Sequence, residues 1–460
     1  MIIDQTPLDL EVRRVFDSSF RPPQYGYIGQ FKIEAKVIDI IRVIGMDIQS
    51  DYELTYGPVM ILEIVLPLGD YSSLIYPVRE KLEFILKTEK LDYTNKTLED
   101  KEESVTVETF SVSLLPGARP FTSEDNNMEN LGREAQNLMD LVVINIQLKP
   151  KLLDDISKMT VGGHFINKTN ADLLRNLIMV YCNTIEVDNE QKLLGVDINA
   201  TASEVKRSST LIPHNVKLSD LADFLQMKQG GVFPSGMAQF VHERIWYIYP
   251  PYDTSFFDES KEKIVIISVP ANRYPQVEKT YLTQNGITTI LATGNKKITS
   301  DKQQIQDNAG NGVMFADANQ IVQGFAKDKG NVALISPKSN GSAFVGEERS
   351  NGKNNVQMSP EGITANPFIA TSRIARSQGH FYNVEWENGD HELIKPGLNV
   401  KIMFLNEGEV KFINGVLLKS HVQVKMNGTG LMVTGYRTFI VMQIFVKAED
   451  AFEAGLTGLT

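Results

Sequence analysis

The clearest pattern of hydrophobic and polar positions lies between residues 393 and 446. Val400, Ile402 and Phe404 alternate with the residues between them, which is the period of a strand with one buried face. Residues 436–446 are apolar on both faces, as in a strand buried on both sides. Turn-forming sequences separate the runs: Pro396-Gly397, Asn406-Glu407-Gly408, Asn414-Gly415 and Asn427-Gly428. We therefore expect at least four short strands in a small antiparallel barrel or sandwich. The expected core positions are Val400, Ile402, Phe404, Ile440 and Ile444.

Residues 1–150 show a similar β pattern. Alternation over 30–44 predicts a half-buried strand, and the apolar run 60–66 predicts a buried one. Residues 105–115 and 141–148 supply two more candidates. The segment around Leu82 and Phe84 fits a strand or a helix, and we favour the strand. The acidic stretch 98–104 reads as a solvated loop.

The period changes over residues 151–305, which predicts a mixed α+β middle domain. Thr169 or Asn170 can cap a helix, and a second helix starts at Ser219 and stops at Gly230. Two β features follow these helices: an aromatic strand over 239–249, ended by Pro250-Pro251, and a hairpin at Asn285-Gly286. The aromatic cluster could stack nucleic-acid bases or pack in a core, and we favour the core. Its members are Phe240, Trp246, Tyr247 and Tyr249.

The segment that follows the middle domain differs from the rest of the chain in composition. Residues 306–366 are rich in Gly, Asn and Ser, so they bury little apolar area. An extended linker or arm and a disordered surface loop both fit this composition. We then expect a second β-barrel over 367–448 and a flexible tail over 449–460.

Charge and cysteine content narrow the function. The net charge of −11 argues against sequence-independent binding to nucleic-acid phosphates. The one cysteine, Cys182, excludes an internal disulfide and fits a buried thiol in a helix. The first residues contain no apolar signal-peptide core, and no apolar run in the sequence has the length of a membrane span, so we expect no signal peptide and no stable membrane insertion.

We find no residue set that predicts catalysis, a cofactor or a metal. Phosphate-binding, zinc-protease and serine-hydrolase motifs are missing from the sequence. The adjacent carboxylates Asp154 and Asp155 are indistinguishable from solvated acids. The histidines are scattered without metal-ligand spacing, at His164, His214, His242, His380, His391 and His421. We therefore predict a protein without enzymatic activity, catalytic residues or cofactors.

The run LIKPGLNVKIMFLNEGEVKFINGVLL, residues 393–418, resembles the last barrel of the baseplate hub proteins of contractile-tailed bacteriophages. The shared pattern is a proline-glycine entry, a short strand, an acidic turn and a strand that opens into a glycine hairpin. Tyr76-Pro77 and the alternation after it look like the first barrel of those hubs. The middle resembles theirs in its order of proline-bearing loop, short helix and strand.

This resemblance implies a mainly β fold with an α/β insertion, in which two small antiparallel β-barrels flank a mixed α+β middle domain. It implies a structural virion protein of the tail baseplate, assembled in the host cytoplasm. Three copies would join the sixfold tail tube to the threefold tail spike and line a channel through which DNA passes without specific binding. The implied partners are other copies, the spike, here expected as a separate chain, tube or tube-initiator proteins and surrounding baseplate proteins. Alternatives are a sixfold tube-initiator or distal tail protein and a tail-associated cell-wall hydrolase.

Overall fold

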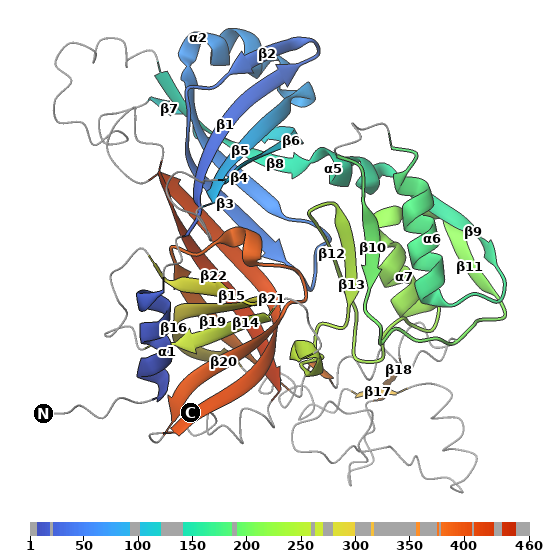
Figure 1. The fold of residues 1–460 in the computed structure, drawn as a ribbon. Coiled ribbons are helices and arrows are strands. Elements are labelled where there is room, and N and C mark those ends of the chain that lie inside the picture. Colours follow the sequence, from blue (N-terminus) through green and yellow to red (C-terminus); the bar gives the residue numbers. More distant parts are fainter. Residues whose placement is uncertain are drawn as a thin grey trace, which may run out of the picture.

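The structure is a computed structural model of the chain, and it is mainly β (Figure 1). It describes residues 7–18, 22–92, 102–120, 141–185, 191–258, 263–269, 279–299, 314–316, 356–358, 375–376, 379–406, 409–426 and 435–447. One large sheet contains most strands of both ends of the chain. The expected mainly β class with an α/β insertion is confirmed.

The C-terminal half forms a closed six-stranded barrel. Its strands follow one another in the order β21, β20, β14, β16, β19 and β22, and β22 pairs back onto β21. β14 pairs in parallel with β16 and β20, while the other neighbours are antiparallel. The strands are β14 (Lys263–Ser268), β16 (Ile287–Thr299), β19 (Gly379–Glu387), β20 (Asn399–Asn406), β21 (Glu409–Met426) and β22 (Tyr436–Lys447). β15 (Tyr281–Gln284) pairs with β16 through a turn at Asn285-Gly286, as expected.

Two strands of this barrel come from residues that we had assigned to the middle domain. β14 and β16 pair with β20 and β19, so the barrel contains residues on both sides of the predicted boundary at 305. β14 reads KIVIIS, an apolar run without alternation, and such runs are typical of strands between parallel neighbours. The sequence pattern predicts a strand there, but it does not indicate which sheet receives it.

All five predicted core residues are buried in this barrel. Val400 and Ile402 are each 1% exposed, Phe404 is 6% exposed, and Ile440 and Ile444 are fully buried. The outer face of the barrel carries α1 (Pro7–Asp17), whose Leu8 and Val15 pack against a small cluster that includes Ile267 and Leu291. The predicted register of β20 is therefore confirmed, because a slip by one residue would have turned these side chains outward.

The N-terminal half supplies the rest of the large sheet. Its strands lie in the order β2, β1, β5, β6, β8, β4, β3, with β7 beside β8. They are β1 (Gln24–Ile33), β2 (Lys36–Asp39), β3 (Arg42–Asp51), β4 (Val59–Pro67), β5 (Glu83–Asp92), β6 (Glu102–Leu114), β7 (Arg119–Pro120) and β8 (Leu141–Pro150). Short helices fill the β4–β5 connection: α2 (Leu68–Asp70), a π-helix (Tyr71–Ile75) and a 3-10 helix (Tyr76–Lys81). The segment with Phe84 is a strand, as favoured.

One expected strand is a hairpin instead. We predicted a single strand over residues 30–44, but β1 ends at Ile33 and β2 returns antiparallel, with Phe31 opposite Ile38. Glu34 has a positive φ of 52°, which marks the turn. The period of two continues through this short hairpin, so alternation alone does not reveal it.

The two halves are joined strand to strand. β3 pairs antiparallel with β21, from Lys419 opposite Asp51 to Lys425 opposite Gly45, so the sheet continues from one half into the other. β21 serves both halves because it is one long strand, whereas we expected a break at Asn414-Gly415. Gly415 lies where the antiparallel pairing of β21 with β22 begins, opposite Val446, and a Cβ there would lie 2.9 Å from the Phe445 carbonyl oxygen. The glycine marks a close approach of two backbones and not a turn.

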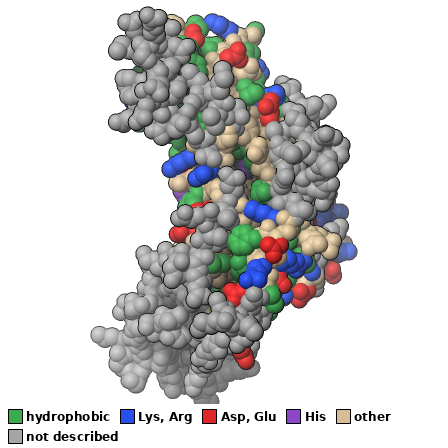
Figure 2. All heavy atoms as spheres, turned by 60° about the vertical axis from the view of Figure 1, so that its left-hand side comes forward, with side chains coloured by type: hydrophobic (Ala, Val, Ile, Leu, Met, Phe, Trp, Pro, Cys, Tyr) green, Lys and Arg blue, Asp and Glu red, His purple; other side chains and the backbone are tan. Residues whose placement is uncertain are grey.

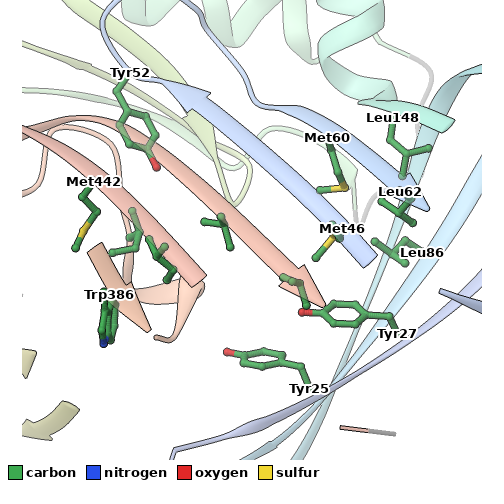
Figure 3. Packing of buried hydrophobic residues seen from close by; sticks show 14 of the residues in the cluster. Tyr25, Tyr27, Met46, Tyr52, Met60, Leu62, Leu86, Leu148, Trp386 and Met442 are labelled. Carbon is green, nitrogen blue, oxygen red and sulfur yellow. The ribbon is translucent and has the colours of Figure 1, made fainter. Parts of the chain in front are cut away.

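The buried side chains of both halves also form one contiguous cluster (Figure 3). Tyr27, Leu62 and Leu86 from the N-terminal half belong to it together with Trp386 and Met442 from the barrel. Shared burial of this kind favours two β halves that behave as one rigid body.

The middle domain packs beside these sheets with a core of its own. Its helices are α5 (Lys151–Lys158), α6 (Asn170–Cys182) and α7 (Leu221–Lys228), and its strands are β9 (Thr160–Phe165), β10 (Gly195–Ile198), β11 (Thr210–Lys217), β12 (Ala238–His242) and β13 (Ile245–Tyr249). Thr169 caps α6 as predicted, since its side chain accepts a hydrogen bond from the Asp172 N–H at 3.0 Å. Gly230, with a φ of +77°, follows α7.

The aromatic strand expected over residues 239–249 is also a hairpin. β12 and β13 pair antiparallel, with Phe240 opposite Tyr247, and Glu243 and Arg244 form the turn at φ 46° and 64°. Two consecutive positive φ values are typical of a primed hairpin turn. Neither residue type signals such a turn, so the sequence reads as one strand.

Several expectations fall outside the described residues. These are the turn at Asn427-Gly428, most of the acidic loop over 98–104, the tail over 449–460 and most of the linker over 306–366. Within that linker β17 (Met314–Ala316) and β18 (Val356–Met358) pair in parallel. In the part of the chain that the structure describes, no helix has the length and apolar character needed to cross a membrane.

Candidate assembly site at the junction of the two β halves

Charged side chains are paired across strands on the outer face of the joined sheet, around the junction of β3 and β21. Lys419 on β21 contacts Asp51 on β3 at 2.6 Å, and His421 lies 2.8 Å from Asp47. Farther along the sheet, Arg119 contacts Glu63 at 2.8 Å. Figure 2 shows acidic and basic side chains interspersed over the described surface on one side of the molecule. Such a mixture offers no continuous basic track for a phosphate backbone.

A second contact joins the halves through buried polar groups. The Tyr25 hydroxyl on β1 donates a hydrogen bond to Asp390 at 2.6 Å, and Asp390 is only 5% exposed. Lys90 on β5 pairs with Glu392 at 2.5 Å and lies 3.8 Å from Asp390. Asp390 and Glu392 lie at a one-turn 3-10 helix (His391–Leu393) that connects β19 to β20. We call these four residues the clasp: Tyr25, Lys90, Asp390 and Glu392.

The clasp is positioned by local hydrogen bonds and rings. Asp390 also accepts from the Glu392 N–H at 3.1 Å, which caps the short helix and fixes the carboxylate. The His391 ring lies 4.9 Å from the Tyr25 ring, centroid to centroid. Burial raises the pKa of Tyr25, and the charge of Asp390 raises it further, so the phenol remains a hydrogen-bond donor.

Two histidines beside the clasp are kept neutral. Burial lowers the pKa of His242 on β12 to about 4, and the charges of Lys395 and His391 contribute, while Glu392 opposes them. Burial likewise lowers the pKa of His391, against the charges of Asp390 and Glu392. In the folded protein, His242 and His391 at the junction of β1, β5, β12 and the short helix therefore resist protonation.

This arrangement predicts a loss of stability in mild acid. The unfolded chain binds protons at its histidines near pH 6.5, whereas folded His242 does so only near 4. The free energy of unfolding should therefore fall as the pH drops from 6.5 towards 4, by up to about 1.4 kcal/mol per pH unit for each such histidine. Urea unfolding followed by tryptophan fluorescence at several pH values measures this slope.

His242→Gln should flatten the slope between pH 6.5 and 5, because it removes one of the groups that protonates on unfolding. His164→Gln is the matched control, since His164 is an exposed histidine that contacts Ser209 at 2.8 Å. Equal slopes for wild type and His242→Gln would contradict the assignment.

Hydrogen bonds of three further tyrosines connect the middle domain to the joined sheet. The Tyr52 hydroxyl lies 2.8 Å from the Ser420 hydroxyl on β21, and Tyr249 of β13 donates to the Tyr52 carbonyl at 2.9 Å. Tyr252 donates to Glu53, which also pairs with Arg376 at 3.0 Å. These bonds tie the connection after β3, the middle domain and the entry to β19 together at one place.

The candidates considered from sequence lie in ordinary structural roles. Cys182 is 1% exposed, and burial raises the pKa of its thiol to about 12. Phe240, Trp246 and Tyr249 are buried, and the partly buried Tyr247 packs against the core, so the aromatic cluster belongs to the core, as favoured. Asp154 pairs with Lys158 at 2.6 Å and with Lys149 at 3.4 Å. Among the described residues no group of three or more His, Cys, Asp or Glu side chains is arranged to hold a metal ion.

The clasp residues were not singled out from the sequence. Tyr25 and Asp390 are separated by 365 positions, and Lys90 and Glu392 by 302. One local signal was available, since Asn388-Gly389 followed by Asp390 reads as a turn with a helix cap. That signal places Asp390 at a helix start but gives no information on its partner.

Comparison with known proteins gives similarities in fold only. No protein-family model and no curated protein matches the sequence. The solved 43 kDa tail protein of prophage MuSo2 from Shewanella oneidensis has a TM-score of 0.46 and 12% identity, with 92% of this chain and 99% of that chain covered. A chain of the PdpA–VgrG complex has a TM-score of 0.42 and 9% identity, over 94% of this chain but 66%, less than two thirds, of its own length. A type VI secretion component of E. coli has a TM-score of 0.38 and 7% identity, over 91% and 77% of the two chains.

Proposed function

We propose that this chain is a structural protein of a phage-type tail, and specifically the baseplate hub that joins the tail tube to the spike. The observation that carries the proposal is the strand-to-strand joining of two β halves through β3 and β21, with the α+β domain to one side. The hub-like pattern of residues 393–418 implies two β-barrels that flank an α+β domain, and the direct pairing of the two β halves goes beyond that expectation. A hub must present a rigid repeated surface to its neighbours, and a shared sheet supplies rigidity without a flexible connection.

The proposed assembly contains three copies. Each copy brings two β halves to a ring, so three copies present six β units to a sixfold tube while the rest of the chain repeats three times. The spike, tube or tube-initiator and surrounding baseplate proteins are the proposed partners, in the virion after assembly in the host cytoplasm. The mixed, paired charges of the joined sheet suit a channel wall along which DNA slides.

The symmetry of the particle tests this proposal. Native mass spectrometry of the purified chain, and electron microscopy of tails that contain it, should give three copies around a threefold axis. Six copies per tail, or particles without a threefold axis, would reject the hub in favour of a sixfold tube-initiator or distal tail protein.

Absence of enzymatic activity belongs to the same proposal. The described residues show a structural partner for each carboxylate considered from sequence and no metal-ligand cluster. Incubation with purified peptidoglycan should release no more soluble product than buffer does. Cleavage that a single carboxylate or histidine substitution abolishes would instead support the cell-wall hydrolase.

A further inference from the structure

β6 extends well beyond the strand beside it. It pairs with β5 from Ser111 opposite Glu83 to Glu102 opposite Asp92. On its other side it pairs with β8 only from Phe110 to Leu114. β8 ends at Pro150, which lacks an N–H, and α5 begins at the next residue. Among the described strands, none pairs with residues 102–109 of β6 on that side.

The backbone of this stretch is oriented for hydrogen bonding. The Leu115 N–H donates to Asn145 beside β8, whereas the Val112 N–H donates to Leu82 beside β5. Because successive residues of a strand point their backbone groups to alternate sides, odd-numbered residues face the β8 side. The N–H and C=O groups of Val105 and Val107 therefore project from the open edge.

The described part of this edge lacks two of the usual protections against pairing, a bulge and a proline. Glutamates do lie along it, and at its end the Gln191 side chain donates to the Thr109 hydroxyl at 2.8 Å. The β5–β6 register runs without a bulge, and no proline interrupts residues 102–109. Val105 and Val107 are 47% and 46% exposed, and Ile28, which lies in the same row across β5, is 46% exposed. Folded proteins rarely leave a regular strand edge of β-forming residues uncovered. We expect this edge to be covered in the assembled state.

The charges beside the edge favour a basic occupant. The Glu108 side chain faces the opposite side of the strand from Val107. Desolvation raises the pKa of Glu108, and the charges of Glu243 and Glu392 raise it further, whereas the charge of Arg244 lowers it. Lys90 already pairs with Glu392 in the clasp, so Glu108 and Glu243 are the carboxylates that a lysine or arginine of the occupant would offset.

We propose that residues 104–109 of β6 accept an extended segment of a partner protein as an added strand. The segment alternates apolar side chains, which lie beside Val105 and Val107, with basic side chains beside Glu108. A second copy of this chain fits less well, because its net charge of −11 would meet the same carboxylates. This inference does not depend on the proposed hub function.

A designed peptide tests the inference on the full chain. The probe is a fluorescein-labelled peptide of alternating valine and lysine, and the control peptide has the same charge with a central proline that prevents strand pairing. Fluorescence anisotropy should show saturable binding of the first peptide and not of the second. In hydrogen exchange, the amides of Val105 and Val107 should become protected when the first peptide binds.

Three variants locate the binding at the edge. Val107→Pro removes an N–H that faces the open side and spares the pairing with β5, so affinity should fall at least roughly tenfold. Val107→Thr keeps that N–H and should bind nearly as wild type. Glu108→Lys should weaken binding of the lysine peptide and favour a peptide of alternating valine and glutamate. Circular dichroism checks that the Glu108→Lys and Val107→Pro variants are folded.

Several outcomes would overturn the proposal. They are equal binding of both peptides, unchanged affinity in Val107→Pro, and no saturable binding. A wild-type oligomer that Val107→Pro converts to monomer would assign the edge to a second copy instead.

Discussion

Replacement of Trp386 by alanine is expected to destabilise the closed barrel by about 3–5 kcal/mol, a large part of the stability of a typical domain. Trp386 on β19 is fully buried, and its ring meets Tyr281 edge to face at a centroid distance of 5.3 Å. Its indole N–H donates to the Thr280 hydroxyl at 3.0 Å. The alanine variant would lose this bond and leave a cavity inside the cluster that both β halves share.

Trp386→Phe is the matched control. It retains most of the aromatic volume, and the Thr280 hydroxyl still donates to the Glu387 carbonyl at 2.7 Å. We expect a loss of only about 1–2 kcal/mol for this variant. Urea unfolding followed by circular dichroism measures both values, and Trp246 fluorescence reports on the middle domain in the same samples. Wild-type stability of Trp386→Ala would contradict the burial of this side chain.

Gly415→Val should prevent the barrel from closing. A Cβ at residue 415 would lie 2.4 Å from Ile444 Cγ2 and 2.9 Å from the Phe445 carbonyl oxygen, and a backbone atom cannot move aside as a side chain can. We expect destabilisation of at least about 3 kcal/mol, seen as insoluble or poorly folded protein on expression.

Gly195→Val provides the comparison for this second substitution. Gly195 also lies in a strand, β10, but a Cβ there meets no atom within 4 Å. The Gly195→Val variant should therefore express as soluble protein with a stability close to that of wild type. Similar behaviour of the two variants would show that β21 and β22 do not approach closely at residue 415.

The sequence was informative where one local pattern decides the structure. The alternation around Ile402 predicted its burial correctly, and the Thr169 cap and the Asn285-Gly286 hairpin follow from local chemistry. The sheet to which a strand belongs does not follow from local chemistry, because β14 pairs with a strand more than a hundred positions later. The turn at Glu243-Arg244 was missed because neither residue type favours positive φ.

The candidate site was the least predictable part. Its contacts are long-range pairs such as Tyr25 with Asp390, and a single sequence contains no signal that links the two residues. The structural role of Gly415 was also ambiguous, because it depends on a contact with a distant strand. Gly415 permits a close approach of two paired strands, and the sequence pair Asn414-Gly415 is indistinguishable from a hairpin turn.

The pairing of β3 with β21 has a consequence for synthesis on the ribosome. β3 is complete at Asp51, but its partner on one side ends only at Met426. During most of translation, the nascent chain therefore carries a strand edge that has no partner from its own sequence, next to apolar residues of the future shared core. A chaperone that holds the nascent N-terminal half would protect this edge until β21 emerges.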